Sequence, residues 1–535
     1  MHARLASCLG ILAILLVAAA IRLPPLPTKG VSFVDEGFQL QEGRFLASVA
    51  VAAMGTVGIA WPVGLDPDFA TIDGLATPTR WGSLRGSPVL TGRPLHSTLL
   101  GLAMLFAGER PVAGQMVAAL LGLATVAMVF AIARRLYGSA SALVAAAALA
   151  VSGWHAIYST QALAESDSLF VAAIALWLGL GTRPHRLLWT GLALGVAFLT
   201  NPRTWVLVPI ILLVEALRRW PISLSNLGTY AGGVLLPLIL ADVVSRMGVL
   251  VGAPLIFGNY LLDRSGTIAR WVSFLAGNAQ AFRTPPPRAP LIDQISFYPF
   301  LTWAWDGPLL AGLLGLGLAG VVWRRRRAEL PVLVIFLGAF VAQTFLTSIA
   351  ARFFLLLALP AALLAGRSLL WVSPGRRGLC AGLLLAVLLL EGIPRSSGLA
   401  SVSSGYREAA ALIVRETGGK HLSNQSANTG FYTGLANARW LDDDLEKVRR
   451  DVAEGYYLAV VALRPGLAAA ASWGDLPEAR RLEPVAIIPN AYGASLQQRM
   501  EVIFIPLSDR IRDVSRVSGS IFVYDLRPLT TGMLP

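Results

Sequence analysis

The chain has 535 residues, of which 55% are hydrophobic and only 14% are charged, and its formal net charge is +13. Soluble globular proteins carry roughly 25% charged residues, so this composition excludes a soluble protein and indicates a polytopic helical membrane protein. The positive charge does not indicate a nucleic-acid partner, because most basic residues cluster in short loops between apolar runs, as the positive-inside rule describes.

The apolar runs predict about eleven membrane spans. The first run, Leu5–Leu23, is too long for the apolar core of a cleaved signal peptide and lacks a small-residue cleavage site. We therefore expect a retained span with a cytoplasmic N-terminus. Further runs, near the ~20 residues that a spanning helix needs, lie at 112–135, 139–155, 163–181, 186–200, 203–218, 226–245, 307–323, 330–349, 353–372 and 377–393.

Basic clusters set the expected orientation of these spans. They fall on one side, which we take as the cytoplasmic side, and comprise Arg134-Arg135, Arg183–Arg186, Arg218-Arg219, Arg324–Arg327 and Arg376-Arg377. This requires that the segment 94–108 does not cross the bilayer, and we expect it to lie as a helix at the outer interface. The extracytoplasmic side then receives the first loop (24–111), the turn at Glu165, the loop 246–306 and the chain after Pro394.

The composition changes at about Ser401, which predicts a membrane domain (1–398) followed by an extracytoplasmic α/β domain (399–535). Its predicted elements are amphipathic helices at 406–419 and 442–455 and strands at 456–463, 485–489, 502–507 and 520–526. The domain has no GxGxxG motif, and the fragment GFYTG (430–434) is too weak to indicate a nucleotide site.

Two adjacent carboxylates, Asp35 and Glu36, follow the first span. They are compatible with a solvated turn or a helix N-terminus, where acids complement the helix dipole. Alternatively, one of them accepts a proton from an attacking hydroxyl or amine, because a neighbouring like charge raises a carboxyl pKa toward the range that a general base needs. Glu165 and Asp167 open another span on the same side, where they either cap the helix or face a cavity.

Two arginines, Arg203 and Arg352, begin spans on the predicted outer side, where the positive-inside rule disfavours them. Each either extends to anionic headgroups or binds a lipid phosphate, whose oxygens suit the guanidinium fork. In the outer loop, Trp303 and Trp305 indicate an interfacial belt or, alternatively, a surface that stacks on sugar rings. The five histidines show no metal-ligand spacing, so we predict no cofactor and leave a divalent cation open.

Five segments, in this order, resemble the GT-C glycosyltransferases, especially protein O-mannosyltransferases and the transferases that attach aminoarabinose to lipid A. The segments are FVDEGFQLQEGRFLA (33–47), GRPLHSTLLGLAMLFAGERP (92–111), VFAIARRLYG (129–138), GLALGVAFLTNPRTWVLVP (191–209) and ARFFLLLALPAALLAG (351–366). Two departures stand out: the usual Lys-Pro is Asn201-Pro202-Arg203, and the usual Pro-Pro-Leu is Arg93-Pro94-Leu95.

The resemblance implies a GT-C-like membrane fold and a reaction. A polyprenyl-phosphate sugar enters from the bilayer, and a hydroxyl or amine of a protein, lipid or glycan acceptor attacks its anomeric carbon at the outer face of the cytoplasmic membrane. By resemblance Asp35 is the base, Glu36 supports it, Glu165 is the acid of the second outer loop, and Arg203 and Arg352 hold the donor phosphate. Possible substrate-binding residues are Arg93, His96, Asp167, Arg264 and Arg270.

Two other classes of function fit the sequence less well. A transporter or lipid flippase would show inverted repeats and polar or broken helices at mid-depth in both halves of the chain. Here the acids cluster on one face, and only one pair of spans is clearly broken. A non-catalytic anchor for the C-terminal domain would need neither so many spans nor outward arginines. The glycosyltransferase therefore ranks first.

Overall fold

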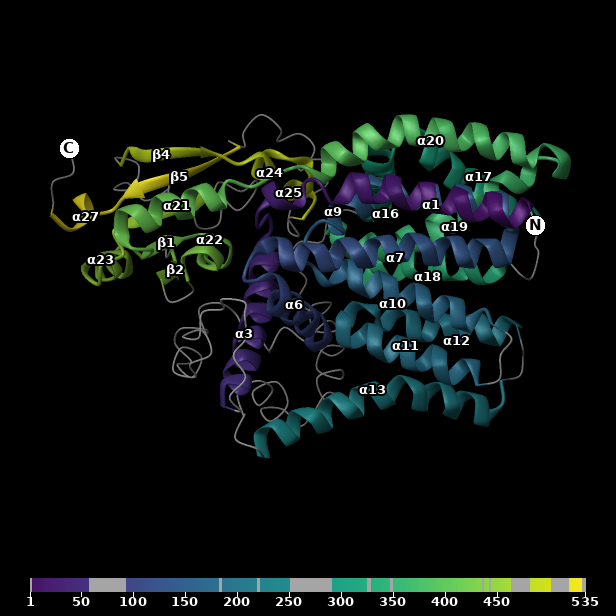
Figure 1. Cartoon of the computed structure of the whole chain (residues 1–535), viewed down its shortest axis with the longest axis horizontal. Helices are drawn as coiled ribbons and strands as arrows, with labels where there is room; N and C mark the ends of the chain where they lie inside the picture. The colour runs from purple at the N-terminus through teal and green to yellow at the C-terminus, as the bar shows by residue number, and fades with distance from the viewer. Residues whose placement is uncertain are drawn as a thin grey trace.

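The computed structural model describes residues 2–56, 93–181, 185–218, 222–250, 291–324, 329–346, 350–434, 437–441, 444–462, 482–501 and 519–531. These residues form a bundle of long helices with a smaller α/β domain at one end (Figure 1). Helix α1 (His2–Arg22) begins at the end of the bundle farthest from the α/β domain, and α27 (Pro528–Thr531) lies at the far tip of that domain.

The long bundle helices lie roughly side by side (Figure 1). Their bounds are α1 (His2–Arg22), α7 (Pro111–Tyr137), α8 (Ser139–Ala150), α10 (Ala164–Gly179), α11 (Arg186–Thr200), α12 (Leu207–Arg218), α13 (Leu224–Leu250), α17 (Pro308–Arg324), α18 (Leu330–Leu346), α19 (Ala358–Arg367) and α20 (Arg377–Ala400). Each lies in or overlaps a span that the sequence predicts.

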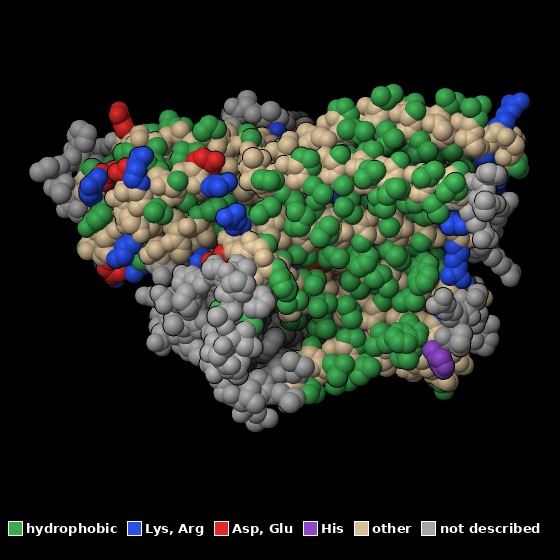
Figure 2. Space-filling model, in the orientation of Figure 1, with side chains coloured by type: hydrophobic (Ala, Val, Ile, Leu, Met, Phe, Trp, Pro, Cys, Tyr) green, Lys and Arg blue, Asp and Glu red, His purple; other side chains and the backbone are tan. Residues whose placement is uncertain are grey.

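In the described part of the chain, five helical stretches are long and apolar enough to cross a membrane: Leu5–Lys29, Pro111–Tyr137, Leu224–Ala241, Ala351–Trp371 and Pro374–Ala400. Figure 2 shows hydrophobic side chains over the bundle, with charged side chains gathered on the α/β domain and at the opposite end. The chain is therefore a helical membrane protein. The other bundle helices are shorter apolar segments, so the count of about eleven spans stays a prediction.

At the end of the bundle opposite the α/β domain, two helix ends carry basic residues, Arg186 at the start of α11 and Arg218 at the end of α12. Arg186 and Arg218 both donate hydrogen bonds to the carbonyl of Gly179, at the C-terminal end of α10, at 2.8 and 3.0 Å. They satisfy a carbonyl that the helix itself leaves unpaired. Glu165 lies at the other end of α10, ~24 Å away for 16 residues at 1.5 Å each.

Two of the predicted spans begin with 3₁₀ helices at the end of the bundle near the α/β domain. In one, η3 (Pro202–Val206) precedes α12, because Pro202 has no N–H to continue α11 and the Asn201 side chain accepts from the Arg203 N–H at 3.2 Å. In the other, η5 (Ala351–Leu357) precedes α19, and η6 (Ser368–Trp371) follows it. These irregular starts carry Arg203 and Arg352.

Two helices lie across the end of the bundle rather than along it: α3 (Val34–Thr56) and α6 (Pro94–Ala107) (Figure 1). They pack closely, because a Cβ on Gly43 of α3 would come within 2.6 Å of the Leu100 Cβ of α6. At 14 residues α6 measures ~21 Å, too short for the ~30 Å hydrocarbon core. The helix predicted at 94–108 is present, and its location at the outer interface stays a prediction.

The α/β domain contains a five-stranded sheet in the order β2-β1-β3-β5-β4. The strands are β1 (His421–Ser423), β2 (Ala438–Trp440), β3 (Leu458–Ala462), β4 (Pro484–Pro489) and β5 (Ser520–Asp525). Strand β1 runs parallel to β2 and β3, whereas β5 runs antiparallel to β3 and β4. The helices are α21 (Tyr406–Thr417), α22 (Ser426–Thr433) and α23 (Leu445–Ala453), with the short α24 (Ala491–Ala494), α25 (Leu496–Met500) and α27 (Pro528–Thr531).

Strand β3 is buried on both faces because a helix covers each. Ala459 and Val461 join the cluster that contains Val448 of α23, whereas Val460 joins the cluster that contains Ile413 of α21. Three of the four strands predicted here appear as β3, β4 and β5, and the fourth, 502–507, lies outside the described residues. The three-residue strands β1 and β2 were not predicted.

The aromatic segment before α17 corrects one prediction. It forms α16 (Leu291–Leu301) and the π-helical turn η4 (Thr302–Asp306). Trp303 is 61% exposed, but Trp305 is 1% exposed and packs edge-on against Trp154 with ring centroids 5.6 Å apart. Neither an interfacial belt nor a sugar-stacking surface therefore includes Trp305, which belongs to the core.

Candidate active site

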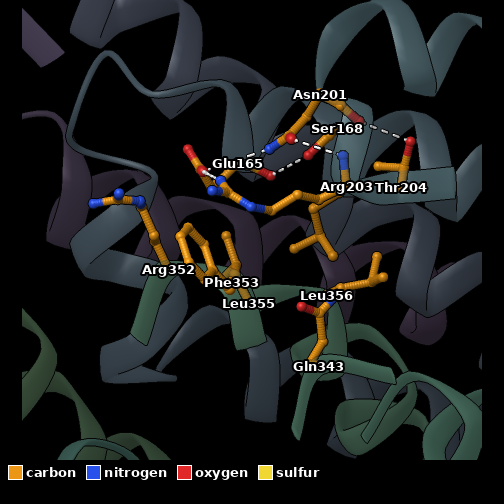
Figure 3. Close-up of a pocket in the computed structure, with 11 residues that line it drawn as sticks. Glu165, Ser168, Asn201, Arg203, Thr204, Gln343, Arg352, Phe353, Leu355 and Leu356 are labelled. Atoms are coloured by element: carbon orange, nitrogen blue, oxygen red, sulfur yellow. Dashed lines mark hydrogen bonds and ion pairs between the residues drawn. The ribbon is translucent and has the colours of Figure 1, made fainter. Parts of the chain in front are cut away.

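A pocket opens at the end of the bundle near the α/β domain, where the starts of α10, η3 and η5 meet (Figure 3). Its empty space, which includes space open to solvent, amounts to about 310 Å³. Its polar residues are Glu165, Ser168, Asn201, Arg203, Thr204, Gln343 and Arg352, and its apolar wall consists of Leu169, Phe353, Leu355 and Leu356. Such a pocket suits a ligand with a charged head and an apolar chain.

Arg352 contacts two carboxylates from distant parts of the chain. Its Nη2 lies 3.1 Å from Oδ2 of Asp35, at the start of α3, and its Nη1 lies 2.9 Å from Oε2 of Glu501. Its backbone N–H also donates to Oε1 of Glu501 at 3.1 Å, and the Tyr158 hydroxyl donates to the same oxygen. The Arg352 side chain is 7% exposed and that of Asp35 is 33% exposed, so the Asp35 carboxylate remains accessible.

Arg203 is less completely paired. Its Nη1 lies 3.7 Å from Oε1 of Glu165, beyond hydrogen-bond distance, and its side chain is 27% exposed. Its guanidinium carbon lies 3.4 Å above the ring of Phe353, and that of Arg352 lies 4.8 Å from the same ring. Figure 3 shows that Arg203 and Glu165 extend toward each other across the pocket. Phe353 therefore orients both arginines at one end of the pocket.

Several buried polar atoms of this pocket have no hydrogen-bond partner in the described part of the chain. They are Oε2 of Glu165, Nη1 of Arg203 and Nε of Arg352. Buried polar groups are ordinarily paired, so unpaired atoms converging on a pocket indicate groups that meet a polar ligand.

Glu36 points away from this pocket although it neighbours Asp35. It is fully buried, and its carboxylate accepts hydrogen bonds from the backbone N–H groups of Ser32 and Ala162 at 2.7 and 2.9 Å and from the Gln115 amide at 3.0 Å. Burial raises the pKa of Glu36, and the hydrogen bond from Gln115 opposes that rise. Glu36 thus connects the start of α3 to α7 and to the segment before α10.

His96 and Asp167 form a separate buried pair, with Nδ1 of His96 2.5 Å from Oδ2 of Asp167. The pair joins α6 to α10 and does not line the pocket. Arg93, at the start of α6, lies close enough to Arg203 for their charges to repel. Arg264 and Arg270 lie outside the described residues. The structure therefore brings Asp35, Glu165, Arg203 and Arg352 together.

Comparisons with known proteins bear on the fold. Residues 91–245 match the family model described as dolichyl-phosphate-mannose-protein mannosyltransferase. No curated protein sequence matches the chain. Among solved structures, ArnT from Cupriavidus metallidurans in the apo state has a TM-score of 0.56 at 14% identity, covering 99% of both chains.

ArnT bound to undecaprenyl phosphate has a TM-score of 0.55 at 14% identity, covering 97% of this chain and 98% of that one. The Archaeoglobus fulgidus oligosaccharyltransferase in complex with Zn and sulfate has a TM-score of 0.56 at 13% identity, covering 90% of this chain and 73% of that one. The chain has a GT-C fold. The resemblance that the sequence predicts is confirmed.

Sequence analysis named Glu165, Arg203 and Arg352 but missed Glu501, which contacts Arg352. Glu501 directly follows α25 of the α/β domain and belongs to no motif. Burial raises the pKa of Glu501, while the Arg352 guanidinium and the Tyr158 hydroxyl limit that rise. Only the placement of the domain against the bundle reveals its contact with Arg352, 149 residues away.

Metal binding finds no further support in the described residues, which contain no group of three or more His, Cys, Asp or Glu side chains able to hold an ion. The divalent cation that the sequence leaves open is therefore assigned no ligands.

Proposed function

We propose that this GT-C-fold chain is a glycosyltransferase that moves a sugar from a polyprenyl-phosphate donor to an acceptor hydroxyl or amine. The observation that carries the proposal is a pocket with an apolar wall that both Arg203 and Arg352 line, with the accessible Asp35 carboxylate 3.1 Å from Arg352. Its support is the fold, because one protein with this fold has been solved with undecaprenyl phosphate.

The chemistry follows from these groups. Asp35 accepts the proton of the acceptor O–H or N–H while the acceptor atom bonds to the anomeric carbon of the sugar. The bond between that carbon and the phosphate oxygen breaks, and the electron pair leaves with the lipid phosphate. Because negative charge develops on the leaving phosphate, a nearby guanidinium lowers the barrier without transferring a proton.

The two arginines then take different roles. Arg203 is partly exposed, and its carboxylate neighbour among the described residues lies at 3.7 Å, so it can bind the donor phosphate without losing a close ion pair there. Arg352 already holds two carboxylates within 3.1 Å and is nearly buried. We therefore assign the predicted phosphate role to Arg203 and the orientation of Asp35 to Arg352. Glu165 lies opposite Arg203, where it can hold the donor sugar or the acceptor.

We place the pocket at the outer face of the cytoplasmic membrane. The basic start of α11 and the basic end of α12 lie ~24 Å from the pocket along α10, and the positive-inside rule assigns such ends to the cytoplasm. The α/β domain (399–535) is then extracytoplasmic. A pocket at helix ends also favours a transferase over a transporter, whose site lies near the bilayer midplane.

Mass spectrometry tests this proposal. Polyprenyl-phosphate sugars and envelope glycans are compared in cells with and without the gene. We expect one lipid-linked sugar to accumulate without the gene and one modified acceptor to disappear, which would identify both substrates. Purified protein should then transfer that sugar in vitro. Identical lipid and glycan profiles in the two strains would argue against the proposal.

A further inference from the structure

The α/β domain holds the segment that leads into Asp35. The Tyr432 hydroxyl accepts from the Val31 N–H at 2.9 Å, and the Ser404 hydroxyl donates to the Val31 carbonyl at 2.5 Å. Six residues beyond Asp35 in the same helix, the Gln41 amide donates to the carbonyl of Ala427 at 2.8 Å. The domain therefore contacts the chain on both sides of the candidate base.

The same domain supplies the second carboxylate that contacts Arg352. Both oxygens of Glu501 accept from Arg352, one from Nη1 and one from the backbone N–H, and Tyr158 donates to it as well. Three donors facing one carboxyl group match its ionised form, which has acceptors only. The two oxygens of Glu501 thereby hold Arg352 at its backbone N–H and at Nη1. This contact fixes the position of the other terminal nitrogen, Nη2, against Asp35.

We propose that Glu501 is a positioning residue of the active site, through which the α/β domain orients Arg352 and sets the basicity of Asp35. This inference rests on the function proposed above. It makes the α/β domain an integral part of the catalytic site rather than an appended module, because without Glu501 the described residues leave Arg352 with Asp35 as its one carboxylate within 4 Å.

The effect on Asp35 has a definite sign. The charged and titratable groups around Glu501 are Tyr158 of α9 (Gly153–Tyr158), Glu165 of α10, Arg352 of η5 and Tyr492 of α24. Those around Asp35 include Arg203 and Arg352. Removing the Glu501 charge leaves Arg352 to act on Asp35 alone and removes a negative charge nearby. Both changes stabilise the Asp35 carboxylate, so its pKa falls and it becomes a weaker base.

The experiment compares Glu501→Gln, Glu501→Asp and a control, Glu416→Gln, in the full-length protein with the donor and acceptor identified as above. Glu416 lies in the same domain in an exposed ion pair with Arg415. For Glu501→Gln we expect kcat at pH 7 to fall about tenfold and the acidic limb of the kcat–pH profile to move to lower pH. The donor KM should change little. Glu501→Asp should recover part of kcat, and Glu416→Gln should match the wild type.

Two results would overturn the inference. In one, Glu501→Gln has the kcat and the acidic limb of the wild type while Asp35→Asn is inactive. That result would refute the role of Glu501 and leave the proposed function intact. The other is a loss of activity proportional to loss of folded protein with an unmoved acidic limb, since a merely structural role predicts that pattern. Absence of sugar transfer by the wild-type protein itself would instead refute the proposed function, and the inference with it.

Discussion

Arg203 and Arg352 have the same side chain at neighbouring positions of one pocket, but their charges are neutralised to different extents. Arg352 has carboxylates at 2.9 and 3.1 Å, whereas Arg203 has one at 3.7 Å. An anionic ligand competes with the ion pairs that an arginine already makes. The less paired arginine is therefore the better phosphate ligand, and the more paired one is better suited to hold Asp35.

Substituting each arginine by alanine should separate these roles. Arg203→Ala should weaken binding of undecaprenyl phosphate about 10- to 100-fold, because a hydrogen bond to a charged group contributes about 1.5–3 kcal/mol. Arg352→Ala should mainly lower kcat. Direct binding of the lipid by native mass spectrometry, together with kcat and KM for the donor, measures both effects. Arg415→Ala, at an exposed site, is the control. Equal loss of lipid binding in the two pocket variants would contradict the assignment.

At the scale of elements, the position of α3 depends on its contact with α22. Gly37 of α3 faces this helix so closely that a Cβ would come within 2.7 Å of Oδ1 of Asn428 and 2.8 Å of the Ala427 backbone. Asp35 lies in the same turn of α3. Any change in the contact between the two helices therefore displaces the candidate base.

Gly37→Ala should separate α3 from α22 and destabilise the protein by about 1–3 kcal/mol, the usual cost of an overpacked contact. We expect a lower melting temperature, faster hydrogen exchange in the peptide that covers α22, and reduced transfer. Gly398→Ala is the matched control, because a Cβ at this helical glycine meets no atom within 4 Å. A Gly37→Ala variant as stable and active as Gly398→Ala would refute this role of the contact.

The elements also show what sequence can predict. Long apolar runs predicted the bundle helices and placed Arg203 at the start of a span, because these features are local. Strands β1 and β2 are three residues each, too short to show a periodicity. Glu36 was predicted to support Asp35 as a neighbouring charge. The helix directs the two side chains apart, so that Asp35 contacts Arg352 whereas Glu36 accepts hydrogen bonds from Gln115 and Ala162. Glu501 carries no local signal, since its role arises from a contact between distant segments.

At the scale of the whole molecule, the two ends of the bundle carry different features. Arginines contact the carbonyl of Gly179 at one end, and the pocket and α/β domain lie at the other. Hydrophobic side chains cover the surface between them (Figure 2). This arrangement predicts that the two ends face opposite sides of a membrane.

Cysteine labelling tests that orientation. In a background with Cys8→Ser and Cys380→Ser, Arg415→Cys places a thiol on the α/β domain and Arg376→Cys places one near the basic end; both positions are exposed. In intact cells a membrane-impermeant maleimide should label position 415, whereas position 376 should react only after permeabilisation. The reverse pattern would place the α/β domain in the cytoplasm and would remove the basis for an extracytoplasmic pocket.

The proposed mechanism depends on Asp35 acting as the base in sugar transfer from a lipid phosphate. Its most direct test is the level of the lipid-linked sugar in cells that lack the gene and are complemented with the wild type, Asp35→Asn or the control Glu416→Gln, at matched abundance in the membrane. We expect the wild type and the control to deplete the donor. Asp35→Asn should leave the donor accumulated, because this variant should consume it at least about a hundredfold less efficiently. Depletion of the donor by Asp35→Asn to the wild-type level would contradict this mechanism.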